Sequence, residues 1–254
     1  MVQLIEKLAI DEQHPRDGAG CAESDAPAAV ADWVDQVLRV GRKPAAATTA
    51  SIILPAYNEA EALPEVLRSL HATIGEQCEV LVVDDGSSDG TGQIASQYPC
   101  RLLTHERNQG KGAAVRTGIR AARGQSIIIM DADNTYPADA VPHMISLLAE
   151  YDFVRGIRSE GTSHIPLLNR IGNSLFNTIL RCLHGLEGTD HLTGLYGLEK
   201  SALERLDLTS NGFDLEVEIG IKARTLGLRS TSFPIKYGPR LGEKKLSAWR
   251  DGLH

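Results

Sequence analysis

The sequence lacks any apolar run that approaches the roughly 20 residues a membrane-spanning helix needs, so we expect no transmembrane segment. It also lacks the pattern of a secretion signal, because acidic residues interrupt the N-terminal stretch MVQLIEKLAIDEQHP before a long enough apolar segment is formed. None of its four cysteines stands in a C-x-x-C pair, which argues against a zinc or redox motif, and scattered thiols are typical of a reducing compartment. We therefore expect a cytoplasmic protein, either soluble or peripheral at the inner face of a membrane.

The sequence also has no excess of positively charged residues. The chain has 26 lysines and arginines against 33 acidic residues, which gives a formal charge of −7 and argues against a nucleic-acid-binding protein. Residues 219–254 depart from this balance, with eight basic residues and two acidic ones. Such a basic end indicates either a local anionic partner, such as a phosphate or a lipid head group, or a solvated surface.

The first 50 residues differ from the rest of the chain. Residues 11–27 are polar and contain Gly and Pro, which is typical of disorder. Residues 29–40 carry apolar side chains at helical spacing and predict a short helix that contacts the domain or a partner chain. We expect an N-terminal extension over 1–50, followed by one domain over 51–254; the oligomeric state is left open.

From residue 51 onward, short apolar runs alternate with segments of helical periodicity. The runs are continuously apolar, which is typical of parallel strands covered on both faces. We expect strands at 51–55, 79–85, 101–105 and 126–133, and helices at 58–73, 112–122 and 138–150. The predicted fold class is α/β, with a mostly parallel sheet flanked by helices, and ligands bind such sheets at the carboxyl ends of the strands.

Polar clusters follow three of these predicted strands. Asp131 and Asp133 come at the end of the run SIIIM, and residues two apart on a strand point the same way. Both carboxylates are therefore predicted to reach one divalent cation, Mg²⁺ or Mn²⁺, of the kind that bridges a diphosphate. Taken alone, a D-x-D pair is more often a turn or a helix cap, but its place opposite a second acidic cluster favours the metal site.

The second acidic cluster is Asp84–Asp85, which follows EVLVV and precedes GSSDGT. Small residues there let the backbone approach a ligand, and a carboxylate can accept hydrogen bonds from a nucleotide base; the alternative is a capped turn. The segment NQGKGAAVRTG lacks the third glycine and the first-strand position of a dinucleotide fingerprint. Lys111, at the start of the helix predicted there, indicates an anion contact instead.

Four motifs of the chain, ILPAYNEAEALPEVL, VLVVDDGSSDGT, ERNQGKGAAVRTGI and IIIMDADNTYP, resemble family 2 glycosyltransferases of the GT-A fold. Later blocks, among them YDFVRGIRS, LNRIGNSLFNTILR and TDHLTGLYGLEKSALERL, resemble the dolichol-phosphate mannose synthase branch and bacterial polyprenyl-phosphate glycosyltransferases. The resemblance extends from Ser51 to the end of the chain. It implies an inverting transferase that uses a nucleoside diphosphate sugar, GDP-mannose-like or UDP-glucose-like, and a polyprenyl phosphate acceptor.

The resemblance also implies roles for individual residues. The expected donor-binding residues are Pro55, Tyr57, Glu59, Asp84, Asp85, Lys111 and Asp131. The expected metal ligands are Asp131 and Asp133, and Asp133 and Asp190 are the expected catalytic residues. The expected acceptor-binding residues are Arg158, Arg170, Ser174 and Arg240.

The metal would neutralise the leaving diphosphate as a Lewis acid. A phosphate acceptor is already ionised and needs no general base, whereas a hydroxyl or thiol acceptor would use Asp190 or His191. A helix predicted from Ile165 is interpreted either as core or as an interfacial helix on a bilayer. Glu216 and Glu218, on a helix predicted over 213–228, are either buried near the site or exposed.

Three other functions compete with this interpretation. A soluble glycosyltransferase for a small-molecule hydroxyl or thiol acceptor is the main alternative. A nucleotidyltransferase would need a basic, glycine-rich loop after the first strand, where the chain has the acidic AYNEAEA. A sugar-nucleotide sensor without activity is disfavoured by the intact D-x-D motif.

Overall fold

The computed structural model of the chain describes residues 49–160, 190–212 and 214–242. The chain divides at residue 46 into two units, and every described residue belongs to the second. The predicted extension therefore lies almost entirely outside the described residues, as does the helix predicted from Ile165. Both stay predictions, and so does the domain boundary at residue 51.

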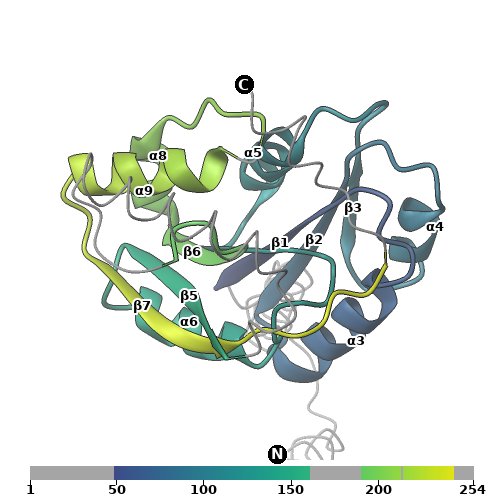
Figure 1. The fold of residues 1–254 in the computed structure, drawn as a ribbon, viewed down its shortest axis with the longest axis horizontal. Helices are drawn as coiled ribbons and strands as arrows, with labels where there is room; N and C mark the ends of the chain where they lie inside the picture. The colour runs from purple at the N-terminus through teal and green to yellow at the C-terminus, as the bar shows by residue number, and fades with distance from the viewer. Residues whose placement is uncertain (1–48, 161–189, 213, 243–254) are drawn as a thin grey trace, which may run out of the picture. The chain divides into compact units, whose positions relative to one another are not determined.

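The described strands form one sheet in the order β3-β2-β1-β4-β6-β5-β7 (Figure 1). Their bounds are β1 Ala50–Ala56, β2 Cys78–Asp84, β3 Arg101–Thr104, β4 Ser126–Met130, β5 Phe153–Glu160, β6 Leu195–Glu199 and β7 Ser230–Lys236. Among them only β6 runs antiparallel to its neighbours, β4 and β5. The remaining pairs are parallel, so the prediction of a mostly parallel sheet is confirmed.

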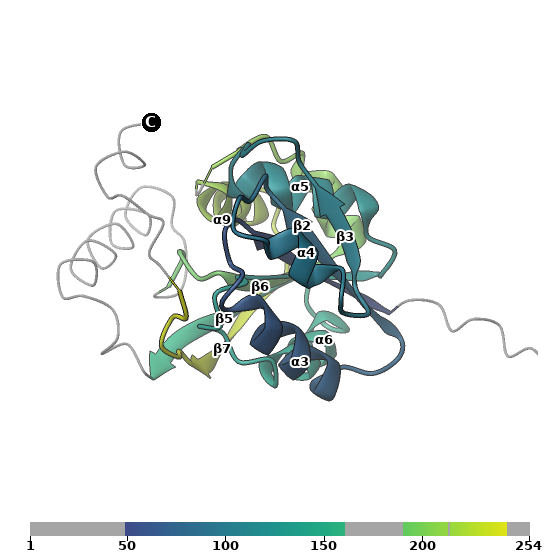
Figure 2. The same cartoon turned by 90° about the vertical axis from the view of Figure 1, so that its right-hand side faces the viewer.

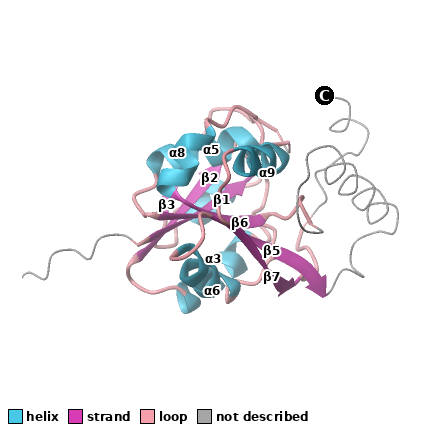
Figure 3. Cartoon of the chain, turned by 90° about the vertical axis from the view of Figure 1, so that its left-hand side faces the viewer, coloured by secondary structure: helices cyan, strands magenta, loops and turns pink. Residues whose placement is uncertain are grey.

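Helices cover both faces of the sheet, which gives three layers. The described helices are α3 Leu63–Thr73, α4 Thr91–Ala95, α5 Lys111–Ala121, α6 Ala140–Leu148, α8 Lys200–Leu206 and α9 Leu215–Thr225. Figure 3 shows α5, α8 and α9 over one face of the sheet and α3 and α6 over the other. No helix in the described part of the chain has the length and apolar character that crossing a bilayer requires.

The alternation of side chains along β1 explains why both layers are needed. Ile52 and Leu54 pack into the core beneath α3 and α6, whereas Ile53 between them packs into the core beneath α5 and α9. Each of these side chains is fully buried, and each such burial stabilises the fold by about 1.5–3 kcal/mol. A Cβ at Gly118 would overlap Ile53, so the glycine lets α5 lie close to β1.

Two of the largest differences between the predicted and the observed bounds of elements lie beside the candidate site. The helix predicted from Asn58 begins only at Leu63, because Asn58 has a left-handed φ of 52° and Pro64 occupies the first turn. The strand predicted to reach Asp133 ends at Met130, and Asn134 has a φ of 65°. In both places, after β1 and after β4, the polar residues that follow the strand lie in a loop.

The topology collects distant segments at one edge of the sheet. The parallel strands β1, β2, β4, β5 and β7 all end there, and the antiparallel β6 begins there. Figure 2 shows β5 and β7 side by side at one end of the sheet. Strand β1 lies between β2 and β4, so the chain order reverses at this point, which is where open α/β sheets bind ligands.

Candidate active site

Asp131 follows β4 directly and is paired with a lysine. Lys111, the first residue of α5, places its Nζ 2.6 Å from Asp131 Oδ1 and 2.6 Å from Glu216 Oε1 on α9. Burial opposes the charge of the ammonium, but the two carboxylates outweigh it and hold the pKa of Lys111 well above its usual value. The anion contact expected of Lys111 is thus made by two protein carboxylates in this structure.

Glu216 is a residue whose role the sequence left open. Its side chain is buried, like those of Ile219 and Ala223 on the same face of α9. The spacing of these three residues is the sequence signal that could have placed Glu216 on the buried face. The alternative that Glu216 is merely exposed is wrong. Glu218 is also well covered, and its carboxylate accepts hydrogen bonds from the backbone of the loop before α9.

Asp133 has different partners from Asp131. Its Oδ1 accepts hydrogen bonds from the backbone N–H and the hydroxyl of Thr135, at 3.1 and 2.5 Å. Its Oδ2 accepts from Arg240 Nη1 at 2.8 Å, and Arg240 Nη2 lies 2.5 Å from Glu59 Oε1. The expectation that Asp131 and Asp133 both lie on the strand is wrong, because β4 ends at Met130, before either of them.

Asp85, after β2, anchors the loop that leads into α5. Its carboxylate accepts hydrogen bonds from the backbone N–H of Gln109 and Gly110, at 2.9 and 2.8 Å. His105 Nδ1 lies 2.6 Å from the same carboxylate. The described contacts of Asp85 therefore fix the residues just before Lys111.

The other expected donor-binding residues surround this loop and the end of β1. Asp84 closes β2, and its Oδ1 accepts a hydrogen bond from the backbone N–H of Ser87 at 3.0 Å. Pro55 lies within β1, and Tyr57, just beyond that strand, exposes 38% of its surface. An exposed aromatic ring offers a face on which a nucleotide base can stack.

The expected acceptor residues are only partly described. Arg158, near the end of β5, forms a bidentate pair with Asp190: Nε donates to Oδ2 at 2.7 Å and Nη2 donates to Oδ1 at 2.6 Å. Arg240 lies on the segment after β7 and contacts Asp133 and Glu59 rather than Arg158. Arg170 and Ser174 lie outside the described residues and stay predictions.

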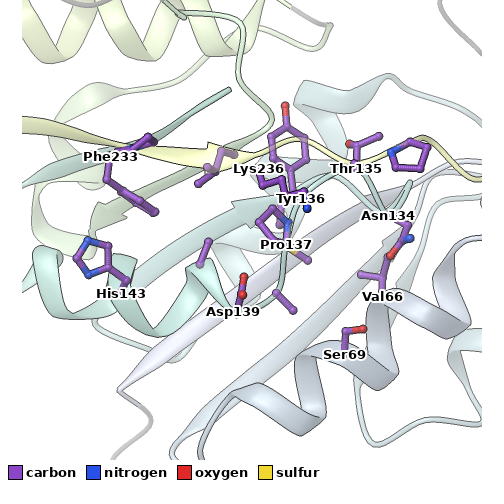
Figure 4. Close-up of a pocket in the computed structure, with 17 residues that line it drawn as sticks. Val66, Ser69, Asn134, Thr135, Tyr136, Pro137, Asp139, His143, Phe233 and Lys236 are labelled. Carbon is purple, nitrogen blue, oxygen red and sulfur yellow. The ribbon is translucent and has the colours of Figure 1, made fainter. Parts of the chain in front are cut away.

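A pocket of about 570 Å³ opens on the α3 and α6 face, behind the loop that follows Asp133. Figure 4 shows Val66 and Ser69 of α3 on one side of it and His143 of α6 on the other. Residues of β7 and of the loop after β4 complete its lining. Among the expected site residues that the structure describes, none lines this pocket. The pocket is therefore distinct from the charged cluster at the strand ends, which consists of Lys111, Asp131, Glu216, Asp133, Arg240 and Glu59.

The charged cluster suits a divalent cation bound together with a diphosphate. Burial raises the pKa of Asp131, and the negative charges of Asp133 and Glu216 add to this effect, while Lys111 opposes it. A dication would relieve this repulsion. No group of three or more His, Cys, Asp or Glu side chains in the described residues forms a complete protein cage. Two carboxylates with substrate phosphates are the usual alternative to such a cage for Mg²⁺.

Comparison with known families matches residues 51–206 to the model described as Glycosyl transferase family 2. This match covers β1 to α8 and includes most of the cluster described above. Arg240 and Glu216 lie beyond it.

Curated relatives include two proteins of Haloferax volcanii. Glycosyltransferase AglJ is 31% identical over 207 residues, which cover 79% of this chain and 67% of the relative. Dolichyl-phosphate hexose transferase is 32% identical over 204 residues, which cover 80% and 88%. The undecaprenyl-phosphate 4-deoxy-4-formamido-L-arabinose transferase of Klebsiella pneumoniae is 29% identical, with 79% of this chain and 63% of the relative covered.

Solved structures with a similar fold include the glucosyl-3-phosphoglycerate synthase of Mycobacterium tuberculosis. Its complex with Mn²⁺, uridine diphosphate and glucosyl-3-phosphoglycerate superposes with a TM-score of 0.61 at 22% identity, covering 78% of this chain and 73% of that one. A complex of the same enzyme with Mg²⁺ and uridine diphosphate gives a TM-score of 0.59. At this level of identity the likeness concerns the fold, and it confirms the predicted GT-A architecture.

Proposed function

The chain belongs to glycosyl transferase family 2, and from this membership we propose that it transfers a hexose from a nucleoside diphosphate sugar to a polyprenyl phosphate, with inversion at the anomeric carbon. Two of the relatives named above are, by name, transferases for dolichyl phosphate and undecaprenyl phosphate. The observation that carries the proposal is that a carboxylate cluster around Asp131, after β4, and the guanidinium of Arg158, near the end of β5, lie at the same edge of the sheet.

The carboxylate cluster is the donor end of the proposed site. Asp131 and Asp133 would hold Mg²⁺ or Mn²⁺, which as a Lewis acid stabilises the negative charge that develops on the leaving diphosphate. Lys111, at the N-terminus of α5 and paired with Asp131, would contact the same anion. Pro55, Tyr57, Glu59, Asp84 and Asp85 would bind the nucleoside, the last of them by holding the loop at Gln109–Gly110 in place.

The guanidinium is the acceptor end. An arginine donates parallel hydrogen bonds that match a phosphate, and Arg158 lies across the strand ends from the carboxylate cluster. Arg170, Ser174 and Arg240 are proposed to complete the acceptor site. A phosphate oxygen attacks the anomeric carbon from the face opposite the diphosphate, and this geometry inverts the configuration.

The test is a transfer assay with purified protein and a panel of nucleotide sugars, with Mg²⁺, with Mn²⁺, or with EDTA. Transfer to a polyprenyl phosphate in detergent is expected with metal only. Asp131→Asn and Asp133→Ala should each abolish it, whereas Asp207→Asn, at the exposed left-handed cap of α8, should not. Full activity in EDTA would exclude the metal role.

The choice of acceptor is decided in the same assay. A water-soluble acceptor with a hydroxyl or thiol group and no phosphate is offered in parallel. Transfer to this acceptor, with none to polyprenyl phosphate, would replace the proposed function by the small-molecule alternative. Transfer to neither acceptor, with donor binding retained, would support a sensor that lacks activity.

A further inference from the structure

Arg158 is held on two sides by other residues. In the plane of the guanidinium, Asp190 accepts from Nε and Nη2, and its carboxylate also accepts from the backbone N–H of Arg158 at 3.2 Å. On the face of the guanidinium, the Tyr237 ring centroid lies 5.4 Å from Arg158 Cζ. Within the described residues, Nη1 is the one guanidinium nitrogen that has no hydrogen-bond acceptor.

Tyr237 is itself fixed to the loop that carries the expected metal ligands. Its ring packs edge-to-face on Tyr136, with centroids 5.4 Å apart. The Tyr136 hydroxyl accepts a hydrogen bond from the backbone N–H of Gly194 at 2.6 Å. Gly238 N–H donates to the carbonyl of Thr135 at 2.8 Å. Arg158 is therefore tied to the same loop as Asp133, and its orientation depends on that loop.

Neither Asp190 nor His191 presents a basic atom to an acceptor. Both oxygens of Asp190 accept hydrogen bonds from Arg158, and these bonds outweigh burial and raise the pKa of the arginine. His191 Nδ1 lies 2.6 Å from Arg155 Nη1. A guanidinium can only donate, so Nδ1 accepts, and the neutral ring carries its proton on Nε2.

We propose that Asp190 and Tyr237 are positioning residues that present Nη1 of Arg158 to the phosphate monoester of the acceptor. Asp190 occupies the Nε/Nη2 edge of the guanidinium and Tyr237 covers its face, so the N–H groups of Nη1 are the ones left to bind the anion. The acceptor oxygen forms the new bond to the anomeric carbon, and the bond to the diphosphate breaks with its electron pair. No proton moves to the protein, because the phosphate oxygen is already ionised. This inference rests on the proposed function.

Asp190→Asn is the first test, with a short-chain isoprenyl phosphate as acceptor. An amide offers one acceptor atom in place of two, so Arg158 loses its fixed plane. We expect the acceptor KM to rise about tenfold or more, kcat to fall by less, and donor affinity by calorimetry to stay unchanged. The shape of the kcat–pH profile should match that of the unmodified protein.

A matched control is available at the opposite end of β5. Asp152 accepts from Arg229 in the same pattern, through the backbone N–H, Nε and Nη2. Asp152→Asn therefore disrupts a pair with the same hydrogen-bond pattern, more exposed than Arg158–Asp190, that lies away from the strand ends where the site is. It should leave the acceptor KM unchanged, so a rise confined to Asp190→Asn reports on position rather than on loss of an ion pair in general.

A second pair of variants tests the other contact and does not depend on Asp190. Tyr237→Leu removes the ring under Arg158 and should also raise the acceptor KM, whereas Tyr237→Phe keeps the ring and should restore most of the affinity. A 100-fold or greater loss of kcat in Asp190→Asn, with KM unchanged and the pH dependence abolished, would identify Asp190 as a general base and overturn the inference. An unmodified protein that does not use isoprenyl phosphate at all would instead refute the proposed function.

Discussion

At the residue scale, the position of Asp131 depends on a glycine across from it. A Cβ at Gly194 would overlap the carboxylate of Asp131, and the backbone N–H of Asp131 donates to the Gly194 carbonyl at 3.2 Å. Gly194 also donates to the Tyr136 hydroxyl. One residue before β6 therefore leaves room for the expected metal ligand and holds the tyrosine that packs on Tyr237.

Gly194→Ala is expected to lower transfer about 100-fold, because a displacement of about 1 Å at a reacting group is enough for a loss of that size. Mn²⁺ affinity, measured by calorimetry in the presence of the nucleoside diphosphate, should fall as well. Gly75→Ala is the control, since nothing lies within 4 Å of a Cβ at that position. Unchanged metal affinity and turnover in Gly194→Ala would show that Asp131 can move without consequence.

At the scale of the element, the expected site residues are placed by the ends of strands and helices rather than by their central residues. Strand β4 ends at Met130, so Asp131 and Asp133 are free to turn toward different partners, Lys111 and Arg240. Helix α5 begins at Lys111 because Asp85 holds the two preceding backbone N–H groups. The apolar pattern of the sequence predicts where strands and helices occur, because it reflects which side chains are buried. It does not predict the residue at which each element ends, because that depends on contacts with other parts of the chain.

Helix α9 provides a stability prediction that depends on pH. Glu218 accepts hydrogen bonds from the backbone N–H groups of Thr209 and Ser210, at 3.0 and 2.9 Å, and pairs with Lys222 at 2.7 Å. Burial opposes ionisation of this carboxyl, but these donors outweigh it and lower its pKa to about 2 from an ordinary 4.5. These hydrogen bonds fix Thr209 and Ser210 in the loop before α9, and the same loop is hydrogen-bonded to α5 through Asn211.

Because the folded-state pKa of Glu218 is depressed, its contribution to the free energy of unfolding is complete above pH 4.5 and is lost as pH falls through about 2. Glu218→Gln should cost about 1–2 kcal/mol at pH 7, measured by urea denaturation. The difference between variant and unmodified protein should shrink between pH 5 and pH 2, a range that follows from the same depressed pKa. A difference that stays constant down to pH 2 would contradict the role of the charge.

At the scale of the whole molecule, the single antiparallel strand in the described sheet brings the proposed acceptor residues to the edge of the sheet that carries the proposed donor residues. Because β6 is antiparallel, Asp190 precedes it at the edge where β5 ends with Arg158. A parallel β6 would place Asp190 at the opposite edge. The direction of β6 thus decides that Asp190 and Arg158 lie at the same edge of the sheet.

The unit that carries these strands begins after residue 46, which makes the N-terminal segment separable in a test. Deleting residues 1–42 should leave transfer and the thermal midpoint nearly unchanged, because every contact described at the site lies within 49–242. The measurements are the transfer rate and the melting temperature of the shortened chain. A loss of folding or activity would show that the helix predicted over 29–40 belongs to the domain or to a contact between chains.

The sequence by itself determined the alternation of strands and helices, the family and the positions of the polar clusters after the strands. These features are local: a buried strand needs an apolar run, and a ligand at a strand end needs polar residues just beyond it. The motifs identify Asp131, Asp133 and Lys111 as expected site residues without any knowledge of their partners.

Only the tertiary structure decided which groups meet. Arg240 contacts Asp133 and Glu59 across separations of 107 and 181 residues, and no local pattern encodes such a pair. Glu216 joins the cluster because the loop before α9 is hydrogen-bonded to α5 and both helices bury side chains in the same core, and Asp190 engages Arg158 because β6 is antiparallel. The physical reason is that a charged pair forms where packing of the apolar cores brings its members together, and that packing is a property of the whole sheet rather than of any segment.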